Sequence, residues 1–426
     1  MPLDTESTPG PHNIIRKEYP NGMTVLVKEN FSSPSVVVDG LFRANSAADL
    51  TGKEGLSSFT TDVLMRGTTH RSFAQIYEEI ESVGASVDVS SGINISSFGA
   101  KSLAEDLPLV VDILSDVLRE PIFPADEIEK VRGEISTSLE ERDNDTRRKA
   151  GLAFRELLYP KGHPYSRSTE GYRDSVQSIT RDDIANFYRS RYGAKGMMVS
   201  IVGAVNAADA FKIWENKFGD WIGATPDRVE LPGAPRLTDK REKRIDIPGK
   251  SQSDLVMGFI GPARSAPDYL AARLGNSILG VFGLYGRIGE QVREKGGMAY
   301  YSYSQIEGGV GPGAWRVVAG VSPQNVDKAV KLIRAEIKRF CETKVTAREL
   351  SDNKSHAIGS MPLGLETNDG VAGVILDMEF YSLGLDYLIR YPDLIQSISA
   401  AQIQAAAQQY LDADHFALAV AGPTGI

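Results

Sequence analysis

Cysteine is almost absent from this sequence, since only Cys341 among its 426 residues carries a thiol. A chain with one cysteine forms no internal disulfide and no metal cluster built from several thiolates. Cys341 lies in an apolar pattern of helical spacing that includes Ile333 and Ile337, so we expect a buried structural thiol. Histidine is also scarce, and its five positions lack the spacing of metal-ligand pairs. We therefore expect surface or locally hydrogen-bonded side chains at His12, His70, His163, His356 and His415.

Long apolar runs and an excess of basic residues are missing too. No run approaches the roughly 20 apolar residues that a membrane-spanning helix needs, so we predict no membrane segment. The net charge is -9 and no basic stripe stands out, which argues against a nucleic-acid partner. The first ten residues lack the charged and apolar regions of a signal peptide. They predict a cytoplasmic protein, or a periplasmic one if a leader has been removed.

The remaining pattern alternates strands and helices. Residues 24–28 and 35–42 are rich in β-branched residues and predict neighbouring strands, and residues 85–89 and 93–98 predict a hairpin. Helical spacing predicts helices over residues 72–83, 103–118, 180–192, 268–279, 284–294, 325–340 and 347–360, and a long charged helix from Asp126. A second hairpin is expected over residues 300–306 and 315–321.

The two halves of the chain end alike. Residues 178–184 lead into a helix that ends at Tyr192 and then a strand that ends at Gly203, and residues 397–403 lead into a helix that ends at Tyr410 and a strand that ends at Gly422. The corresponding positions are about 219 residues apart, and Ser or Thr is placed to cap each helix. We interpret this as a tandem duplication.

A proline-rich and charged stretch separates the halves. The sequence therefore predicts a flexible tail over residues 1–20, a first domain over 21–224, a linker over 225–242 and a second domain over 243–426. The order of elements predicts an α+β fold, with two tandem homologous domains that are each a mixed, largely antiparallel sheet with helices packed on one face.

Residues 55–68 predict a helix of unusual composition. Leu56, Phe59 and Val63 recur at helical spacing and predict one buried stripe. Ser58 and Asp62 are four residues apart on another face, with Thr61 beside them. That spacing is typical of a zinc helix in which two histidines hold the metal and a glutamate is the general base, but hydroxyls are poor zinc ligands. A core helix with a solvated polar face explains the same pattern.

The residues that flank these three positions resemble the inverted zinc-motif segment of the insulinase/pitrilysin-like metallopeptidases, family M16. Gly55-Leu56 precedes the three positions and residues 65–68 follow them. The resemblance places the first histidine at Ser58, the glutamate at Thr61 and the second histidine at Asp62, so all three are replaced. It extends from about residue 21 to residue 422, and it implies two similar domains that close like a clamshell.

The resemblance places the third zinc ligand, a glutamate in the family, near Ser138. Glu134 and Glu141 lie about one turn to either side of it. A single glutamate without imidazoles does not make a catalytic zinc site, so we predict no metal and no cofactor in this chain.

Residues 291–303 closely resemble the arginine/tyrosine segment of the same family. There, an arginine near a helix end and a tyrosine seven residues later reach the zinc site, and Arg293 and Tyr300 have this spacing. Attack on a peptide carbonyl creates an oxyanion, and an arginine fork and a tyrosine hydroxyl are donors that stabilise it. An arginine that pairs with helix carbonyls and a tyrosine in a core are the structural alternatives.

The resemblance thus implies the zinc-less subunit of a heterodimeric M16 peptidase. A partner subunit with an intact zinc motif would supply the metal, and this chain would supply Arg293 and Tyr300 and bind unfolded peptides, without activity alone. An inert scaffold or peptide-binding protein is the alternative, and a self-sufficient metallopeptidase is disfavoured by the replaced helix. The isolated chain could also form a homodimer.

Overall fold

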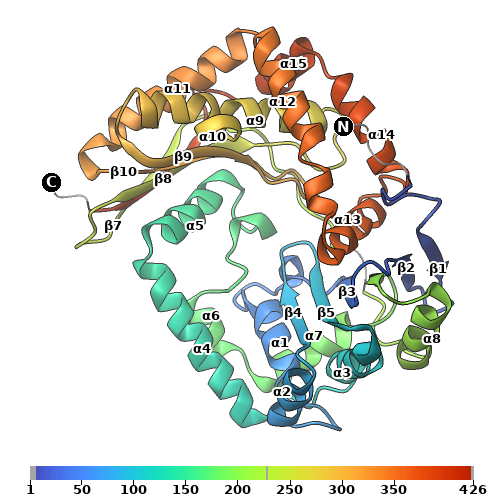
Figure 1. Ribbon diagram of the computed structural model, residues 1–426. Helices are drawn as coiled ribbons and strands as arrows, with labels where there is room; N and C mark the ends of the chain where they lie inside the picture. Colours follow the sequence, from blue (N-terminus) through green and yellow to red (C-terminus); the bar gives the residue numbers. More distant parts are fainter. Residues whose placement is uncertain (1–5, 227–228, 424–426) are drawn as a thin grey trace. The chain divides into compact units, whose positions relative to one another are not determined.

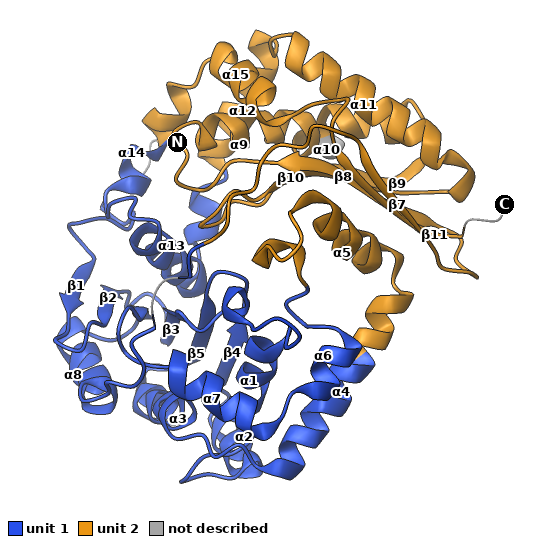
Figure 2. Ribbon diagram, turned by 180° about the vertical axis from the view of Figure 1, so that it is seen from behind, with its two compact units in different colours: residues 1–137, 168–230, 360–391 blue, residues 138–167, 231–359, 392–426 orange. Residues whose placement is uncertain are grey.

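The computed structural model describes residues 6–226 and 229–423, apart from the side chains of Leu284 and Tyr285. Figure 1 shows two β-sheets with helices around them. Contacts divide the chain into two compact units, which Figure 2 draws in different colours. Unit 1 comprises residues 1–137, 168–230 and 360–391, and unit 2 comprises residues 138–167, 231–359 and 392–426.

Unit 1 is built on a six-stranded sheet of order β1-β2-β6-β3-β5-β4. Its strands are β1 (Ile15–Glu18), β2 (Thr24–Glu29), β3 (Ser35–Phe42), β4 (Ser86–Ser91), β5 (Ser96–Leu103) and β6 (Met198–Gly203). Its helices are α1 (Leu56–Leu64), α2 (Phe73–Ser82), α3 (Leu107–Arg119), α6 (Arg173–Ser178), α7 (Arg181–Arg191), α8 (Ala207–Phe218) and α13 (Asn368–Phe380).

Unit 2 is built on a five-stranded sheet of order β7-β11-β8-β10-β9. Its strands are β7 (Arg241–Asp246), β8 (Ser253–Ile260), β9 (Ala299–Ile306), β10 (Ala314–Val321) and β11 (Ala417–Gly422). Its helices are α5 (Thr146–Leu158), α9 (Tyr269–Gly280), α10 (Phe282–Gly289), α11 (Val326–Glu342), α12 (Ala347–Gly359) and α15 (Ala400–Tyr410). Two further helices, α4 (Ala125–Asn144) and α14 (Tyr387–Gln396), contribute residues to both units.

The α+β class is confirmed, and the units share one plan. The last strand of each half, β6 or β11, lies inside its sheet, parallel to one neighbour and antiparallel to the other. The predicted capping is also confirmed: the Thr180 and Ser399 hydroxyls each accept a backbone N–H bond at 3.2 Å, from Asp183 and Gln402. These shared details support the duplication.

One expectation about strands is wrong. The strands at residues 24–29 and 35–42 are not neighbours, because β6 lies between them. β6 is apolar and almost wholly buried, so a central place lets it pair on both edges. The charged residues Arg241–Asp246 form β7, which begins within the last two residues of the predicted linker. A strand of alternating charge fits a sheet edge, where charged side chains stay solvated.

Each sheet receives a helix from the other half of the sequence. α13 packs on β3 and β6 of unit 1, where its apolar residues join Leu26, Val37 and Val202 in one core cluster. α5 packs on β8 and β11 of unit 2. Side chains alternate between the faces of a strand, so Val37 and the buried Phe42 of β3 face opposite sides. Each sheet is therefore covered on both faces, and the units are not the contiguous halves of the sequence.

Candidate functional site

The helix that carries the replaced zinc motif begins at a glycine. Gly55 has a φ of 94°, and a Cβ there would lie 2.8 Å from the Glu170 carbonyl oxygen, so only glycine fits. The Asp49 carboxylate accepts hydrogen bonds from the backbone N–H groups of Gly55 and Ser57, at 2.9 and 2.8 Å. An acid at a helix N-terminus accepts hydrogen bonds from otherwise unpaired N–H groups and interacts favourably with the positive end of the helix dipole. The predicted stripe of Leu56, Phe59 and Val63 is buried as expected.

The polar face of α1 holds hydroxyls where a zinc helix holds ligands. Ser58 is half-buried and Thr61 is buried. The Thr61 Oγ1 donates to the Ser57 carbonyl at 2.9 Å and lies 3.2 Å from the Tyr192 hydroxyl. Thr61 is therefore held by structural hydrogen bonds, and neither hydroxyl is a ligand that zinc favours.

Asp62 is the acidic group of this face. Its side chain is exposed to solvent, and the protein around it nevertheless raises its pKa to about 6. Desolvation is the main cause, opposed by Arg66 and reinforced by Glu134. One carboxylate of this kind offers a proton or a single oxygen ligand, which is too little for a catalytic zinc site.

The carboxylates near the predicted third-ligand position do not complete a metal site. Glu134 forms an ion pair with Arg66 at 2.6 Å, and the Ser138 hydroxyl accepts a hydrogen bond from Arg148 at 3.3 Å. Within residues 6–226 and 229–423, no group of three or more His, Cys, Asp or Glu side chains could hold a metal ion. The donors of this chain therefore do not fit the zinc that the resemblance implies, and the reason is the chemistry of the three replaced positions.

Arg293 lies in an irregular helical turn of unit 2. Residues Glu290–Glu294 form a π-helical turn, in which the Lys295 N–H donates to the Glu290 carbonyl at 2.9 Å. The Gly297 N–H then donates to the Arg293 carbonyl at 3.0 Å, and Gly297 has a φ of 60°, as glycine at a helix end often does. The Arg293 side chain is half-buried. Single π-turns are frequent at functional sites because they redirect a helix end.

Tyr300 lies at a second irregularity. In the register of β9 and β10, Ala299 pairs with Val321 and Tyr301 pairs with Gly320, so Tyr300 is an extra residue on the bulged strand. Its side chain is 64% exposed, which excludes the alternative of a core tyrosine. A β-bulge aims a side chain away from the regular alternation of its strand. Arg293 and Tyr300 thus stand on either side of one glycine turn, each at a break in regular structure.

Beside Tyr300 lies a polar cluster around Asp254, which the sequence did not predict. Tyr301 and Thr146 both donate hydrogen bonds to the carboxylate of Asp254, which is 1% exposed. The Gln252 side chain donates to the same carboxylate at 3.0 Å. Burial and the Asp254 contact raise the pKa of Tyr301 well above its usual range. The cluster holds a buried charge with three donors and joins α5 to the sheet, so it stabilises the packing of unit 2.

The guanidinium of Arg147 covers the same face of unit 2. It lies 5.1 Å from the ring centre of Tyr301 and 5.6 Å from that of Tyr303, and it donates a hydrogen bond to the Tyr303 hydroxyl. Cations over aromatic rings are attracted by the ring quadrupole. Packing of α5 on the sheet of unit 2 brings Arg147 to the two tyrosines of β9, so no local sequence motif predicted the contact.

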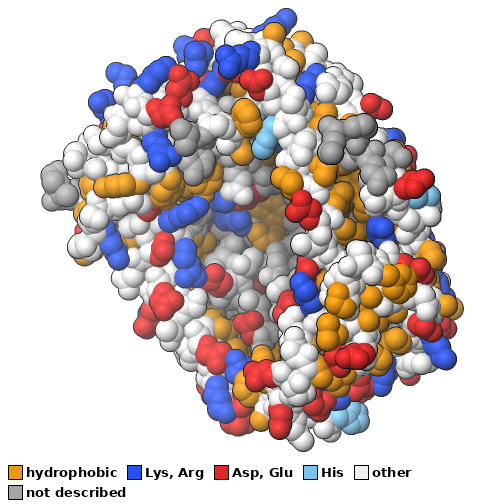
Figure 3. All heavy atoms as spheres, in the orientation of Figure 1, with side chains coloured by type: hydrophobic (Ala, Val, Ile, Leu, Met, Phe, Trp, Pro, Cys, Tyr) orange, Lys and Arg blue, Asp and Glu red, His pale blue; other side chains and the backbone are white. Residues whose placement is uncertain are grey.

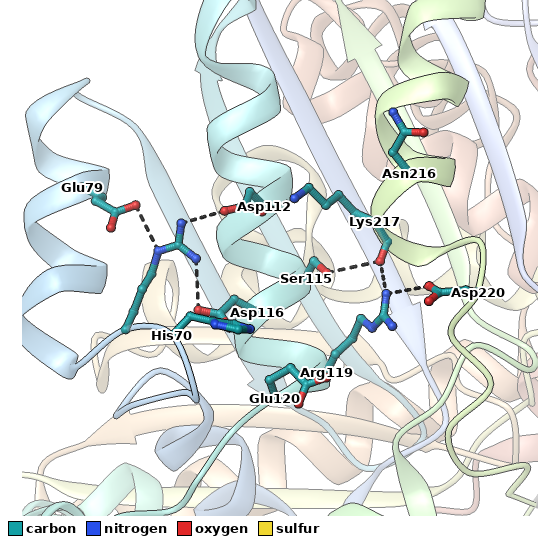
Figure 4. Close-up of a pocket in the computed structure, with 11 residues that line it drawn as sticks. His70, Glu79, Asp112, Ser115, Asp116, Arg119, Glu120, Asn216, Lys217 and Asp220 are labelled. Carbon is teal, nitrogen blue, oxygen red and sulfur yellow. Dashed lines mark hydrogen bonds and ion pairs between the residues drawn. The ribbon is translucent and has the colours of Figure 1, made fainter.

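Unit 1 also contains an open polar pocket of about 580 Å³, between α2, α3 and the end of α8 (Figure 4). Arg71 lies at its wall and pairs with Glu79, Asp112 and Asp116 at 3.0, 2.6 and 3.0 Å. Lys217 also pairs with Asp112. The pocket is thus lined by side chains that hold three helices together, and none of the predicted site residues lies in it.

Figure 3 shows how charged side chains are distributed on one face of the molecule. On the face shown in Figure 3, basic and acidic side chains are intermingled, so no basic stripe for nucleic acid is visible there. No helix within the described parts of the chain has both the length and the apolar character that crossing a bilayer requires.

Comparisons with known proteins agree with the geometry. The model of the insulinase family, peptidase family M16, matches residues 24–159, and the model of the peptidase M16 inactive domain matches residues 178–356. The two matches together cover most of the chain and fall on its two halves.

Individual relatives are similar over most of their length. An uncharacterized zinc protease of Streptomyces coelicolor is 27% identical over 83% of this chain and 77% of its own. The mitochondrial-processing peptidase subunit beta of Saccharomyces cerevisiae is 26% identical over 85% of this chain and 80% of its own. A crystal structure titled peptidase M16 inactive domain, from Pseudomonas fluorescens, superposes with a TM-score of 0.89 at 25% identity and covers 97% of this chain and 98% of that one.

The duplicated α+β units, the helix with a replaced zinc motif and the two family matches therefore agree, and the chain belongs to the M16 peptidase family.

Proposed function

We propose that this chain is the non-zinc subunit of a heterodimeric M16 peptidase. A partner subunit with an intact zinc motif binds the metal, and this chain donates Arg293 and Tyr300 to the reaction and takes part in binding unfolded peptides. The observation that carries the proposal is the polar face of α1, where a member of a zinc-peptidase family has two hydroxyls and one exposed carboxylate in place of its ligands.

The chemistry assigned to Arg293 and Tyr300 follows from their donors. Peptide hydrolysis places negative charge on the carbonyl oxygen, and donors aimed at that oxygen lower the barrier. Arginine contributes a permanently charged fork, and tyrosine contributes a neutral O–H. The π-turn at Arg293, the bulge at Tyr300 and the exposure of its phenol support this assignment, because a residue that acts on a substrate must leave the packed interior.

The relatives' names support a division between subunits. The yeast relative is named as one subunit of a processing peptidase, and the Streptomyces relative is named a zinc protease. A chain that keeps the fold and has lost the ligand set fits the complementary subunit of such an assembly. The alternative, an inert scaffold or peptide-binding protein, is favoured by the same replaced helix and differs only in the role of Arg293 and Tyr300.

The experiment combines this chain with an M16 chain that carries an intact zinc motif, ideally one encoded nearby. Hydrolysis of a fluorogenic unfolded peptide and the zinc content are measured for each chain and for the mixture. We expect activity only in the mixture, with one zinc per pair. Activity of this chain alone, with zinc bound to it, would overturn the proposal.

The scaffold alternative is separated by variants of this chain within the active pair. Arg293→Ala and Tyr300→Phe should abolish most of the activity while pair formation, measured by gel filtration, is retained. Arg348→Ala is a matched control, because the Arg348 side chain is 92% exposed on α12. Full activity in both site variants would leave only a scaffold.

A further inference from the structure

The Tyr300 phenol is not held in place by contacts of its own. Its side chain is 64% exposed, and within the described parts of the chain no hydrogen bond, ion pair or ring contact joins it to another residue. A donor stabilises an oxyanion only when it is aimed at that oxygen from about 2.7–3.1 Å. The direction of the Tyr300 side chain must therefore be set by the backbone of β9.

The backbone of β9 is weakly held at this point. β9 is an edge strand of its sheet and pairs only with β10. The register shifts between Ala299 and Tyr301, and the bulge leaves Tyr300 without a partner on β10. A bulge disrupts the hydrogen-bond ladder and bends the strand. A further restraint is needed if Tyr300 is to keep one orientation.

The next residue along β9 supplies such a restraint. The Tyr301 side chain crosses Gly320 of β10, and its hydroxyl donates to the Asp254 carboxylate of β8. Strand β8 is buried along its whole length and pairs on both edges, with β10 and with β11. The hydrogen bond therefore ties the edge strand, directly after the bulge, to the central strand of the sheet.

Both ends of this tie are fixed. Asp254 is 1% exposed, and its carboxylate accepts hydrogen bonds from two further side chains. A Cβ on Gly320 would lie 2.6 Å from the Tyr301 ring, so the ring lies against the backbone of β10 and only glycine leaves room for it. The Arg147 guanidinium lies 5.1 Å from the centre of the same ring. The Tyr301 side chain is thus held at its hydroxyl and along its ring.

We propose that Tyr301 is a positioning residue, whose hydrogen bond to Asp254 fixes the bulge and thereby the direction of the Tyr300 phenol. Consecutive Cα atoms are about 3.8 Å apart, so a restraint on one residue limits the movement of the next. Misplacement of a reacting group by about 1 Å can cost about 10²-fold in rate. This inference rests on the proposed role of Tyr300 and adds the means by which the chain aims that residue.

The test is a double-mutant cycle in the active pair with a zinc-bearing partner. The kcat and KM for a fluorogenic unfolded peptide are measured for the wild type, Tyr301→Phe, Tyr300→Phe and the double variant. We expect Tyr301→Phe to lower kcat about tenfold and to leave KM within about twofold, because the Tyr300 phenol is misdirected while peptide binding is retained. In the Tyr300→Phe background, the same substitution should change kcat by less than about twofold, because no hydroxyl remains to be misplaced.

A purely structural role of Tyr301 would give a different result. A loss of stability alone would lower kcat by the same factor in both backgrounds, and that outcome refutes the positioning role. An unchanged kcat in Tyr301→Phe refutes it as well, and leaves the proposed role of Tyr300 standing if Tyr300→Phe is impaired. If Tyr300→Phe itself keeps the full kcat, the proposed role of Tyr300 fails and the positioning role fails with it.

Two further variants control for the fold. Gly320→Ala keeps every donor but displaces the Tyr301 ring, so it should lower kcat with the same dependence on Tyr300, and it carries the test if Tyr301→Phe does not fold. Tyr410→Phe removes a similar hydrogen bond, from Tyr410 to Asp268 at 2.9 Å, between α15 and the start of α9. This control should leave kcat unchanged. Thermal melts of each pair show which variants are folded.

Discussion

The two sheets place the same pattern on corresponding strands and satisfy it differently. In unit 2, Asp254 is neutralised within the fold, because Tyr301 reaches across Gly320 and donates to it. In unit 1, Asp39 and Asp88 face one another across Gly99, and no side chain in the described part of the chain donates a hydrogen bond to either. The row Asp254–Gly320–Tyr301 of unit 2 is therefore closed by a hydrogen bond between its two ends, whereas the row Asp39–Gly99–Asp88 of unit 1 has an acid at each end.

The helices α5 and α13, which each pack on the sheet of the other half of the sequence, add to this difference in charge. α5 brings Arg147 to the face of unit 2, where the guanidinium covers Tyr301 and Tyr303. α13 brings an acid, Asp369, to the face of unit 1. Burial is the main cause that raises the pKa of Asp39 to about 6, and Asp369 and Asp88 raise it further. The two acids are not at equivalent positions, because Asp39 lies opposite Ser200 of β6, whereas Asp254 lies opposite Ala421 of β11, the counterpart of Val202.

The largest expected effect is on the kcat of the active pair, when Tyr300 or Arg293 is substituted. Tyr300 is exposed at the bulge, whereas Tyr301 is tied to Asp254. In the active pair with a zinc-bearing partner, Tyr300→Phe and Arg293→Ala should each lower kcat by about 10²–10³, the usual value of one oxyanion donor. Steady-state kinetics measures this effect. A loss confined to KM would assign these residues to binding rather than to the reaction.

Substitution of Tyr301 in unit 2 and of Asp39 in unit 1 should change the free energy of unfolding in opposite directions. Tyr301→Phe removes a donor from the buried carboxylate of Asp254 and should destabilise the protein by about 1–2 kcal/mol. Asp39→Asn should stabilise it by about 1 kcal/mol at pH 7.5, after allowance for partial exposure.

The sign for Asp39 follows from linkage. A carboxyl whose pKa is raised by folding costs stability once the pH exceeds its unfolded value, and the full cost is reached above about pH 6. The gain from Asp39→Asn should therefore shrink toward pH 4. Urea unfolding at several pH values measures both changes. Destabilisation by Asp39→Asn at pH 7.5 would mean that the folded protein already stabilises the ionised Asp39 carboxylate.

The smallest expected effect is that of metal removal. Because the polar face of α1 offers hydroxyls and one carboxylate, treatment of the isolated chain with a chelator should leave its Tm unchanged within about 1 °C. Differential scanning fluorimetry measures it. A drop of several degrees, reversed by zinc, would reveal a metal that contributes to the fold.

Periodic patterns predicted the regular elements well. The buried stripe of α1, the hairpins and the caps at Thr180 and Ser399 all follow from local spacing, and spacing is what the sequence displays directly. The position of β6 between β2 and β3 did not follow, because a strand that inserts from far along the chain leaves no local trace. Helices α5 and α13 are similar cases, since their exchange depends on packing between distant segments.

The candidate site divides in the same way. Ser58, Thr61, Asp62, Arg293 and Tyr300 are found because each belongs to a short motif with a fixed spacing. The row of Asp254, Gly320 and Tyr301 joins three strands, so only the register reveals it. The one available signal was a glycine inside a strand, which often marks the close approach of another group.

The exchange of α5 and α13 has a consequence for the origin of the molecule. A protein made only of residues 21–224 would lack α13, and Leu26 and Val37 would lose the helix that shields them from water. A second copy could lend the absent helix and borrow one in return, as happens in domain-swapped dimers. Gene fusion of two such copies would leave the arrangement observed, in which each sheet is covered by one helix from the other half of the sequence.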